Sequence, residues 1–168
     1  MKGFAMSDKP VVGVVMGSDS DLEVMKKCLS KLEDFGLGYE VRIISAHRTP
    51  EITHEWAATA RERGLKVIIA AAGMSAALSG AIAAVTTLPV VGVPMVSGPL
   101  GGMDAALSTM QLPPGIPVGT MAINGAHNAA IYAATIIGSS CPEMAKKLDD
   151  FKKQMAEKVI AKDQALQN

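Results

Sequence analysis

Aromatic and charged side chains are both scarce in this sequence of 168 residues. Aromatic residues make up 4% of the chain, which leaves few platforms for stacking bases and argues against a protein that binds single-stranded nucleic acid. Charged residues make up 19%, and the 16 basic and 16 acidic side chains cancel. Without a net charge the chain does not attract nucleic acids or anionic membranes by bulk electrostatics. We therefore expect neither as a partner.

Cysteines and long apolar runs are also few. Cys28 and Cys141 lack the spacing of metal ligands and are too sparse for a disulfide scaffold, which favours reduced thiols in the cytoplasm and no metal. No stretch approaches the roughly 20 apolar residues of a membrane-spanning helix. Apolar residues nevertheless make up 49% of the chain, enough for a sizeable core. Together with the low share of charge, this predicts that part of the surface is buried against other copies of the chain.

Short apolar runs alternate with amphipathic stretches along most of the chain. The apolar runs predict strands at residues 11–16, 39–44, 67–71, 90–93 and 118–123. The amphipathic stretches predict helices at residues 20–36, 49–64, 76–86, 104–110, 126–138 and 142–167. This alternation indicates a doubly wound parallel α/β sheet with right-handed crossovers. We expect a disordered leader over residues 1–9, a catalytic domain over residues 10–140 and a C-terminal helical arm of the same domain over residues 141–168.

Two local patterns predict where helices begin. Ser20 and Glu23 have the spacing of a capping box. Thr49 followed by Pro50 is typical of an N-cap residue and the first helical position. In a sheet of this kind, ligands bind beyond the carboxyl ends of the strands. The loops after the first strands are therefore the candidates for chemistry.

The loop after the first strand, residues 17–21, reads Gly-Ser-Asp-Ser-Asp. Glycine allows a tight turn, and the backbone N–H groups at the start of the next helix can bind an anion. We expect a serine and these N–H groups to bind a phosphate, and an aspartate to bind ribose hydroxyls. The alternative is that the polar residues only cap the helix. The dinucleotide and ATP fingerprints are absent, so no such cofactor is expected.

The next two loops add a histidine, an arginine and a run of small residues. In Ser45–Pro50, His47 is a candidate general acid or base, and Arg48 can bind a phosphate with two N–H groups. The alternative is a histidine that is merely hydrogen-bonded at a strand end. The small residues of Gly73–Gly80 allow a ligand to approach the backbone, or they only allow tight helix packing. His127 has no role that the sequence assigns.

In this order, the loops are similar to those of one family. The matching segments are Met16–Asp21 (MGSDSD), Ser45–Pro50 (SAHRTP), the Gly73–Gly80 loop and Leu112–Val118 (LPPGIPV). The SAHRTP string is highly specific, and the similarity extends over about residues 10–160. The chain resembles the N5-carboxyaminoimidazole ribonucleotide mutases, the class I members of the phosphoribosylaminoimidazole carboxylase catalytic subunit family in purine biosynthesis.

The resemblance implies a flavodoxin-like, three-layer fold with a five-stranded parallel sheet, assembled as a cytoplasmic homo-octamer without a cofactor. It also implies an isomerase that moves a carboxyl group from the exocyclic nitrogen to carbon 4 of the aminoimidazole ring, by decarboxylation and recarboxylation. His47 would be the general acid and base. Ser18, Asp21 and Arg48 would bind the ribose 5-phosphate, and residues 97–103 are placed to form a lid over carbon dioxide. Four further residues are expected to bind substrate: Ser45, Gly73, Ser75 and Leu78.

The third loop departs from the class I pattern. Class I members commonly have histidine and proline where this chain has Ala77 and Ser79. The ALSG ending resembles class II members, which carboxylate aminoimidazole ribonucleotide directly with carbon dioxide, whereas Arg48, Thr49 and Pro50 follow class I. The mutase is the main prediction, and the direct carboxylase is the alternative. A flavodoxin-like cofactor-binding module is an alternative of another class, although these loops contain no aromatic residue.

Overall fold

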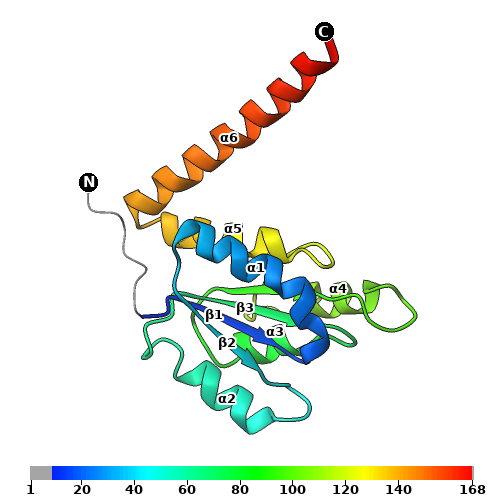
Figure 1. Ribbon diagram of the computed structural model, residues 1–168. Coiled ribbons are helices and arrows are strands. Elements are labelled where there is room, and N and C mark those ends of the chain that lie inside the picture. The colour runs from blue at the N-terminus through cyan, green and yellow to red at the C-terminus, as the bar shows by residue number, and fades with distance from the viewer. Residues whose placement is uncertain (1–8, 168) are drawn as a thin grey trace.

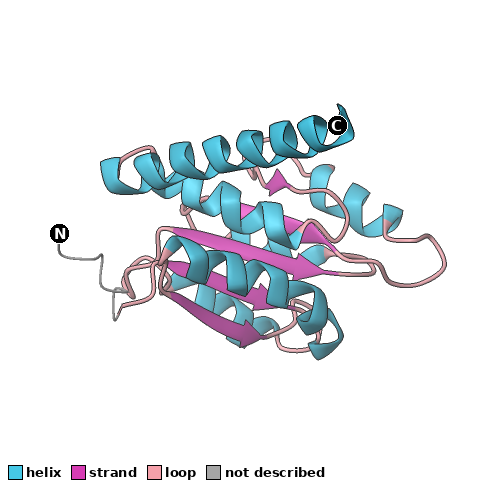
Figure 2. Ribbon diagram, turned by 45° about the horizontal axis from the view of Figure 1, so that its top comes forward, coloured by secondary structure: helices cyan, strands magenta, loops and turns pink. Residues whose placement is uncertain are grey.

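A computed structural model of the chain, which describes residues 9–167, shows a parallel sheet between two layers of helices (Figures 1 and 2). The strands are β1 (Val12–Met16), β2 (Tyr39–Ile43), β3 (Val67–Ala72), β4 (Val90–Pro94) and β5 (Gly119–Thr120). They lie in the order β2-β1-β3-β4-β5, and every neighbouring pair is parallel. The strand order reverses between β1 and β3, which confirms the predicted flavodoxin-like fold. The predicted leader lies outside the described residues except for Lys9.

The helices divide into two covering layers and a C-terminal arm. Their bounds are α1 (Leu22–Phe35), α2 (Pro50–Ala58), α3 (Ala77–Ala83), α4 (Met103–Met110), α5 (Ala126–Gly138) and α6 (Pro142–Gln167), with a 3-10 turn η1 (Asp19–Asp21) before α1. Val14 and Met16 of β1 belong to the apolar cluster under α1 and α5, and Val15 belongs to the cluster under α2 and α3. Because successive strand residues point to opposite faces, covering both faces requires unbroken apolar strands.

The starts of α1 and α2 differ from the predicted caps. The N-cap residue of α1 is Asp21, whose side chain makes no capping hydrogen bond. Ser18 caps the preceding turn η1 instead, and its side chain accepts a hydrogen bond from the Ser20 N–H at 3.3 Å. The predicted capping box of Ser20 and Glu23 is therefore wrong. Thr49 does occupy the N-cap position of α2, but its side chain makes no capping hydrogen bond there. It bonds to Ser45 instead.

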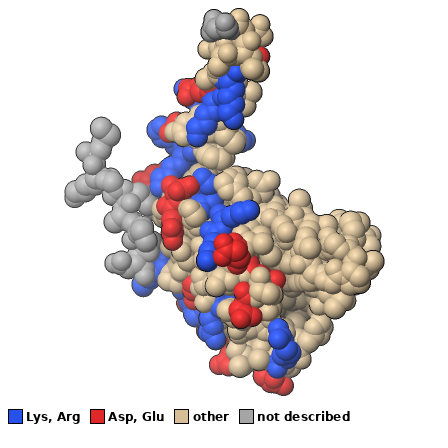
Figure 3. Space-filling model, turned by 45° about the vertical axis from the view of Figure 1, so that its right-hand side comes forward, with Lys and Arg blue, Asp and Glu red and all other residues tan. Residues whose placement is uncertain are grey.

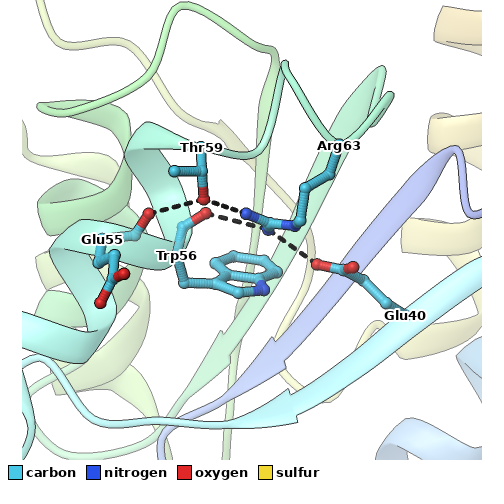
Figure 4. A network of polar contacts seen from close by, with 5 residues as sticks. All are labelled: Glu40, Glu55, Trp56, Thr59 and Arg63. Carbon is cyan, nitrogen blue, oxygen red and sulfur yellow. Dashed lines mark hydrogen bonds and ion pairs between the residues drawn. The ribbon is translucent and has the colours of Figure 1, made fainter.

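The helix predicted over residues 49–64 ends earlier, at Ala58, and turns follow it. Arg63 lies within these turns and its side chain folds back over the Trp56 ring, with its guanidinium 5.4 Å from the ring centre. It donates hydrogen bonds to the Trp56 carbonyl at 3.0 Å and to the Glu40 carboxylate of β2 at 2.9 Å (Figure 4). These contacts join the end of α2 to the sheet and favour turns over further helix.

The edge strand β5 is also shorter than the predicted residues 118–123. Only Gly119 and Thr120 pair with β4. The chain then turns away at Asn124, whose φ of 56° is in the left-handed region and cannot continue a strand.

The C-terminal arm is the long helix α6, and only its first part rests on the domain. Phe151 packs edge-on against Phe35 of α1, with 5.6 Å between the ring centroids. Residues 152–167 are all exposed, and this part of α6 extends away from the sheet and its helices (Figure 1). It carries exposed apolar side chains such as Met155 and Val159. Within a single chain, this apolar stripe is not covered.

Candidate active site

The loops after β1, β2 and β3 line one cavity of about 390 Å³ at the carboxyl edge of the sheet. The cavity brings together seven of the predicted site residues: Ser18, Asp21, Ser45, His47, Arg48, Gly73 and Leu78. Ser75 is exposed and is not among the lining residues. His127 lies elsewhere, in a groove between α5 and α6. The predicted proton-transfer group and the predicted anion-binding turn therefore share one cavity.

The loop after β1 presents polar groups to the cavity, and a backbone hydrogen bond holds its first residue to β3. The Gly17 N–H donates to the Ala71 carbonyl at 3.1 Å, which extends the pairing of β1 with β3 by one residue. Ser18 is extended, with φ −153° and ψ 155°, and its hydroxyl donates to Asp19 at 3.2 Å. η1 and the first turn of α1 follow directly, so the backbone N–H groups at a helix start lie beside the cavity.

Asp21 is a buried carboxyl group in this wall, with 7% of the residue exposed. Burial raises its pKa above the ordinary value of 3.8; the hydrogen bond from the Ser20 hydroxyl opposes this rise, and the charge of Asp19 adds to it. A carboxylate that has lost water and has a single weak donor, at 3.4 Å, can accept further hydrogen bonds. Ligand hydroxyls would supply them.

The loop after β2 carries His47 and Arg48, which are both exposed to solvent in the single chain. The Arg48 backbone N–H donates to the Ser45 hydroxyl at 3.2 Å. The Arg48 side chain reaches the neighbouring loop and donates to the Gly17 carbonyl at 2.6 Å. This bond joins the two loops and places a fixed positive charge beside Ser18. The cavity thus combines one cation, one imidazole and one buried carboxyl group.

Small residues of the loop after β3 form the remaining wall, and Ala77 lies there, where the resemblance implied a histidine. Ser97, just after β4, also lines the cavity, although the sequence analysis assigned it only to the lid. Its Oγ accepts a hydrogen bond from the Met74 N–H at 2.6 Å. The position of Ser97 at the carboxyl end of a strand was the signal that could have identified it.

No three His, Cys, Asp or Glu side chains within residues 9–167 are grouped as metal ligands. Cys28 and Cys141 are free thiols. Burial raises the pKa of the Cys28 thiol to about 12, so this cysteine is not a nucleophile. In the same part of the chain, no helix has the length and apolar character needed to cross a membrane.

Known proteins resemble this chain in sequence and in fold. A family model described as AIR carboxylase matches residues 11–158. The N5-carboxyaminoimidazole ribonucleotide mutase of Pyrococcus horikoshii is 53% identical over 161 residues, which cover 96% of this chain and 91% of that protein. The mutase of Thermotoga maritima is 51% identical over 158 residues, which cover 94% of this chain and 92% of that protein.

A solved structure is similar over the whole domain. PurE from Treponema denticola superposes with a TM-score of 0.86 at 31% identity, and the match covers 95% of this chain and 100% of that one. Sequence motifs, fold and relatives thus agree, and the chain belongs to the AIR carboxylase family.

Proposed function

We propose that this chain is an N5-carboxyaminoimidazole ribonucleotide mutase of de novo purine biosynthesis. It moves the carboxyl group from the exocyclic nitrogen to carbon 4 of the same ribonucleotide and forms 4-carboxyaminoimidazole ribonucleotide. One observation carries this proposal: His47 and Arg48 from one loop share a cavity with Ser18 and Asp21 from another. Relatives at 53% and 51% identity that carry the name of this mutase support it.

The reaction needs a group that gives a proton and later takes one back. Protonated His47 donates its proton to the exocyclic nitrogen, the nitrogen–carbon bond breaks with its electron pair left on nitrogen, and carbon dioxide is released into the cavity. Carbon 4 of the electron-rich ring then attacks the carbon dioxide and forms the carbon–carbon bond. The proton from carbon 4 returns to His47, so nothing is consumed. Histidine suits both steps because it titrates near neutral pH.

The other lining residues hold the ribonucleotide in place. Arg48 and the backbone N–H groups beside Ser18 bind the 5-phosphate, because a guanidinium and a helix start both favour phosphate oxygens. Asp21 accepts hydrogen bonds from the ribose hydroxyls. Fixed groups of this kind hold the ring against His47 and lower the entropic part of the barrier.

The change at Ala77 leaves the mutase as the better supported activity. Ala77 contributes a methyl group to the wall, so His47 is the one imidazole among the described residues that line the cavity. A single histidine is sufficient for the proton balance given above. The mutases of two species at about half identity favour the same reaction over direct carboxylation. A flavin-binding module is not supported, because none of these lining residues is aromatic.

We also infer that the active form is a cytoplasmic homo-octamer, the assembly that the family resemblance implies. Asp104 is the one Asp, Glu, Lys or Arg residue between Lys66 and Glu143. Figure 3 shows a wide face without Lys, Arg, Asp or Glu side chains. On α4, Met103 and Leu107 are exposed apolar side chains one turn apart. Apolar surface of this extent is typical of an interface between subunits.

A comparison of substrates tests the proposed function. The purified chain should convert N5-carboxyaminoimidazole ribonucleotide to the 4-carboxylated product without added bicarbonate. With aminoimidazole ribonucleotide and bicarbonate instead, the rate should be much lower. Faster turnover of the second substrate pair would identify a direct carboxylase and overturn the mutase.

A further inference from the structure

The loop 97–102 leaves the domain and returns to it at one place. It begins after Val96, two residues beyond the end of β4, and ends at Gly102, the N-cap residue of α4. A Cβ atom on Gly102 would lie 3.3 Å from the Val96 Cα and 2.9 Å from Ile123, so the two ends of the loop lie close together and the second end lies against the residue that precedes Asn124. Surface loops whose ends are close can move as units.

Asn124 holds the first end of this loop. Its Oδ1 accepts a hydrogen bond from the Val96 N–H at 3.0 Å, across 28 positions of sequence. Its own N–H donates to the Pro94 carbonyl at 2.8 Å. The φ of 56° at Asn124 is a conformation that asparagine and glycine tolerate better than other residues. Asn124 is therefore suited both to the turn after β5 and to the bond with Val96.

Ser97 transmits this constraint to the wall of the cavity. Its Oγ accepts the hydrogen bond from Met74, and a Cβ atom on Gly73 would collide with the same Oγ. The next residue, Gly98, is close to the Met74 side chain, since a Cβ atom there would lie 3.2 Å from the sulfur. A continuous series of contacts thus runs from Asn124 through Val96 and Ser97 to residues that line the cavity with His47.

We propose that Asn124 is a positioning residue that keeps the loop 97–102 against the cavity, so that carbon dioxide released from the substrate meets the ring before it escapes. Asn124 is not among the residues that line the cavity, and it acts only through Val96 and Ser97. The inference rests on the proposed mutase function, because only a reaction with free carbon dioxide in the site can lose it. A loosened loop then yields aminoimidazole ribonucleotide in place of the 4-carboxylated product.

Two substitutions separate the hydrogen bond from the backbone conformation. In Asn124→Gly, the left-handed φ is retained without strain and the acceptor is lost. In Asn124→Asp, an acceptor oxygen is kept and the same φ is tolerated. Each variant receives N5-carboxyaminoimidazole ribonucleotide, and aminoimidazole ribonucleotide and 4-carboxylated product are both quantified after subtraction of the decarboxylation that occurs without enzyme.

The decisive measurement is the ratio of aminoimidazole ribonucleotide to 4-carboxylated product. Loss of one hydrogen bond changes an open-to-closed equilibrium by about fivefold, so Asn124→Gly should raise the ratio about fivefold and Asn124→Asp should leave it near that of the unsubstituted chain. Because the ratio is set within each turnover, a smaller number of folded molecules does not change it. A structural effect alone would lower the rate and leave the ratio constant.

Each outcome has one meaning. An unchanged ratio in Asn124→Gly, or an equal rise in both variants, overturns the positioning role. If the glycine variant does not fold, Ser97→Ala removes the next acceptor in the same series of contacts, the one for the Met74 N–H, without touching the left-handed position, and is judged by the same ratio. An unsubstituted chain that forms no 4-carboxylated product from N5-carboxyaminoimidazole ribonucleotide overturns the proposed function instead, before any variant is compared.

Discussion

The Thr49 hydroxyl bonds to both backbone groups of Ser45: it accepts a hydrogen bond from the Ser45 N–H at 2.9 Å and donates one to the Ser45 carbonyl at 3.1 Å. The Thr49 N–H donates to the same carbonyl at 2.9 Å. Thr49 thus joins the two ends of the loop that carries His47 and Arg48, although Thr49 does not line the cavity that these two residues share. The Thr49 hydroxyl contributes two of the hydrogen bonds that fix the shape of this loop.

Replacement of Thr49 by valine should therefore lower activity although the side chain keeps its size and branching. Two hydrogen bonds are lost, and at about 1 kcal/mol each we expect kcat/KM to fall ~10-fold or more. Thr49→Ser keeps the hydroxyl and should stay close to the unsubstituted chain. Steady-state kinetics with N5-carboxyaminoimidazole ribonucleotide checks both variants, and full activity of Thr49→Val would show that the loop does not need this closure.

His47→Asn should abolish proton transfer without disturbing the fold. Asparagine can still form hydrogen bonds but does not titrate, so kcat should fall by a factor of about 100 or more. The product should still bind with an affinity within a few-fold of the original, as measured by calorimetry. A variant that turns over at the original rate would remove His47 from the mechanism.

Arg48→Ala should mainly weaken substrate binding. A charged hydrogen bond to phosphate contributes about 1.5–3 kcal/mol, so we expect KM to rise roughly 10- to 100-fold. Arg42 offers a matched control, because it is an exposed arginine on β2 that lies outside the lining of this cavity. If Arg48→Ala and Arg42→Ala give the same KM, the assignment of Arg48 to the phosphate is wrong.

Asp21→Asn should stabilise the folded chain at neutral pH while it weakens substrate binding. Burial raises the pKa of Asp21 above 3.8, so the ionised carboxylate is less favourable in the folded state than in the unfolded one. That cost is fully present above the raised pKa and disappears as the pH falls below 3.8, where the carboxyl group is protonated in both states. The Tm gain of the variant, from thermal unfolding at several pH values, should shrink in the same direction. A Tm loss at pH 7 would contradict the expected effect of burial.

The central strands could be predicted from sequence because strands that are buried on both faces are continuous apolar runs. The predicted range 67–71 matches β3 to within one residue, and its residues alternate between the two apolar clusters. The end of α2 was not predictable in this way. It depends on the contact of Arg63 with Glu40, which lies 23 positions away. The spacing of residues within a helix does not indicate a contact between residues so far apart in the sequence.

The candidate site, too, could be predicted only in part from the sequence. Its loops follow the first strands of a parallel sheet, so topology alone predicts that they meet at one edge. Ser97 was missed as a lining residue because the Gly- and Pro-rich segment around it reads as a mobile loop. The structure fixes it through the close approach of Gly73, where any larger residue would collide with the Ser97 side chain. Such an approach depends on three-dimensional packing that composition does not show.

The free part of α6 provides a test of the assembly. Val159 is 67% exposed in the single chain, and an octamer would cover an apolar side chain of this kind. Val159→Glu should therefore shift the sedimentation profile from eight chains towards smaller species, because a buried carboxylate without a partner is unfavourable. Gln154→Glu introduces the same charge at an exposed position of the same helix. Five residues of helix turn it about 140° away from Val159, so it should leave the assembly intact. A monomeric unsubstituted chain would exclude the octamer, and an octameric Val159→Glu variant would place the interface away from this part of α6.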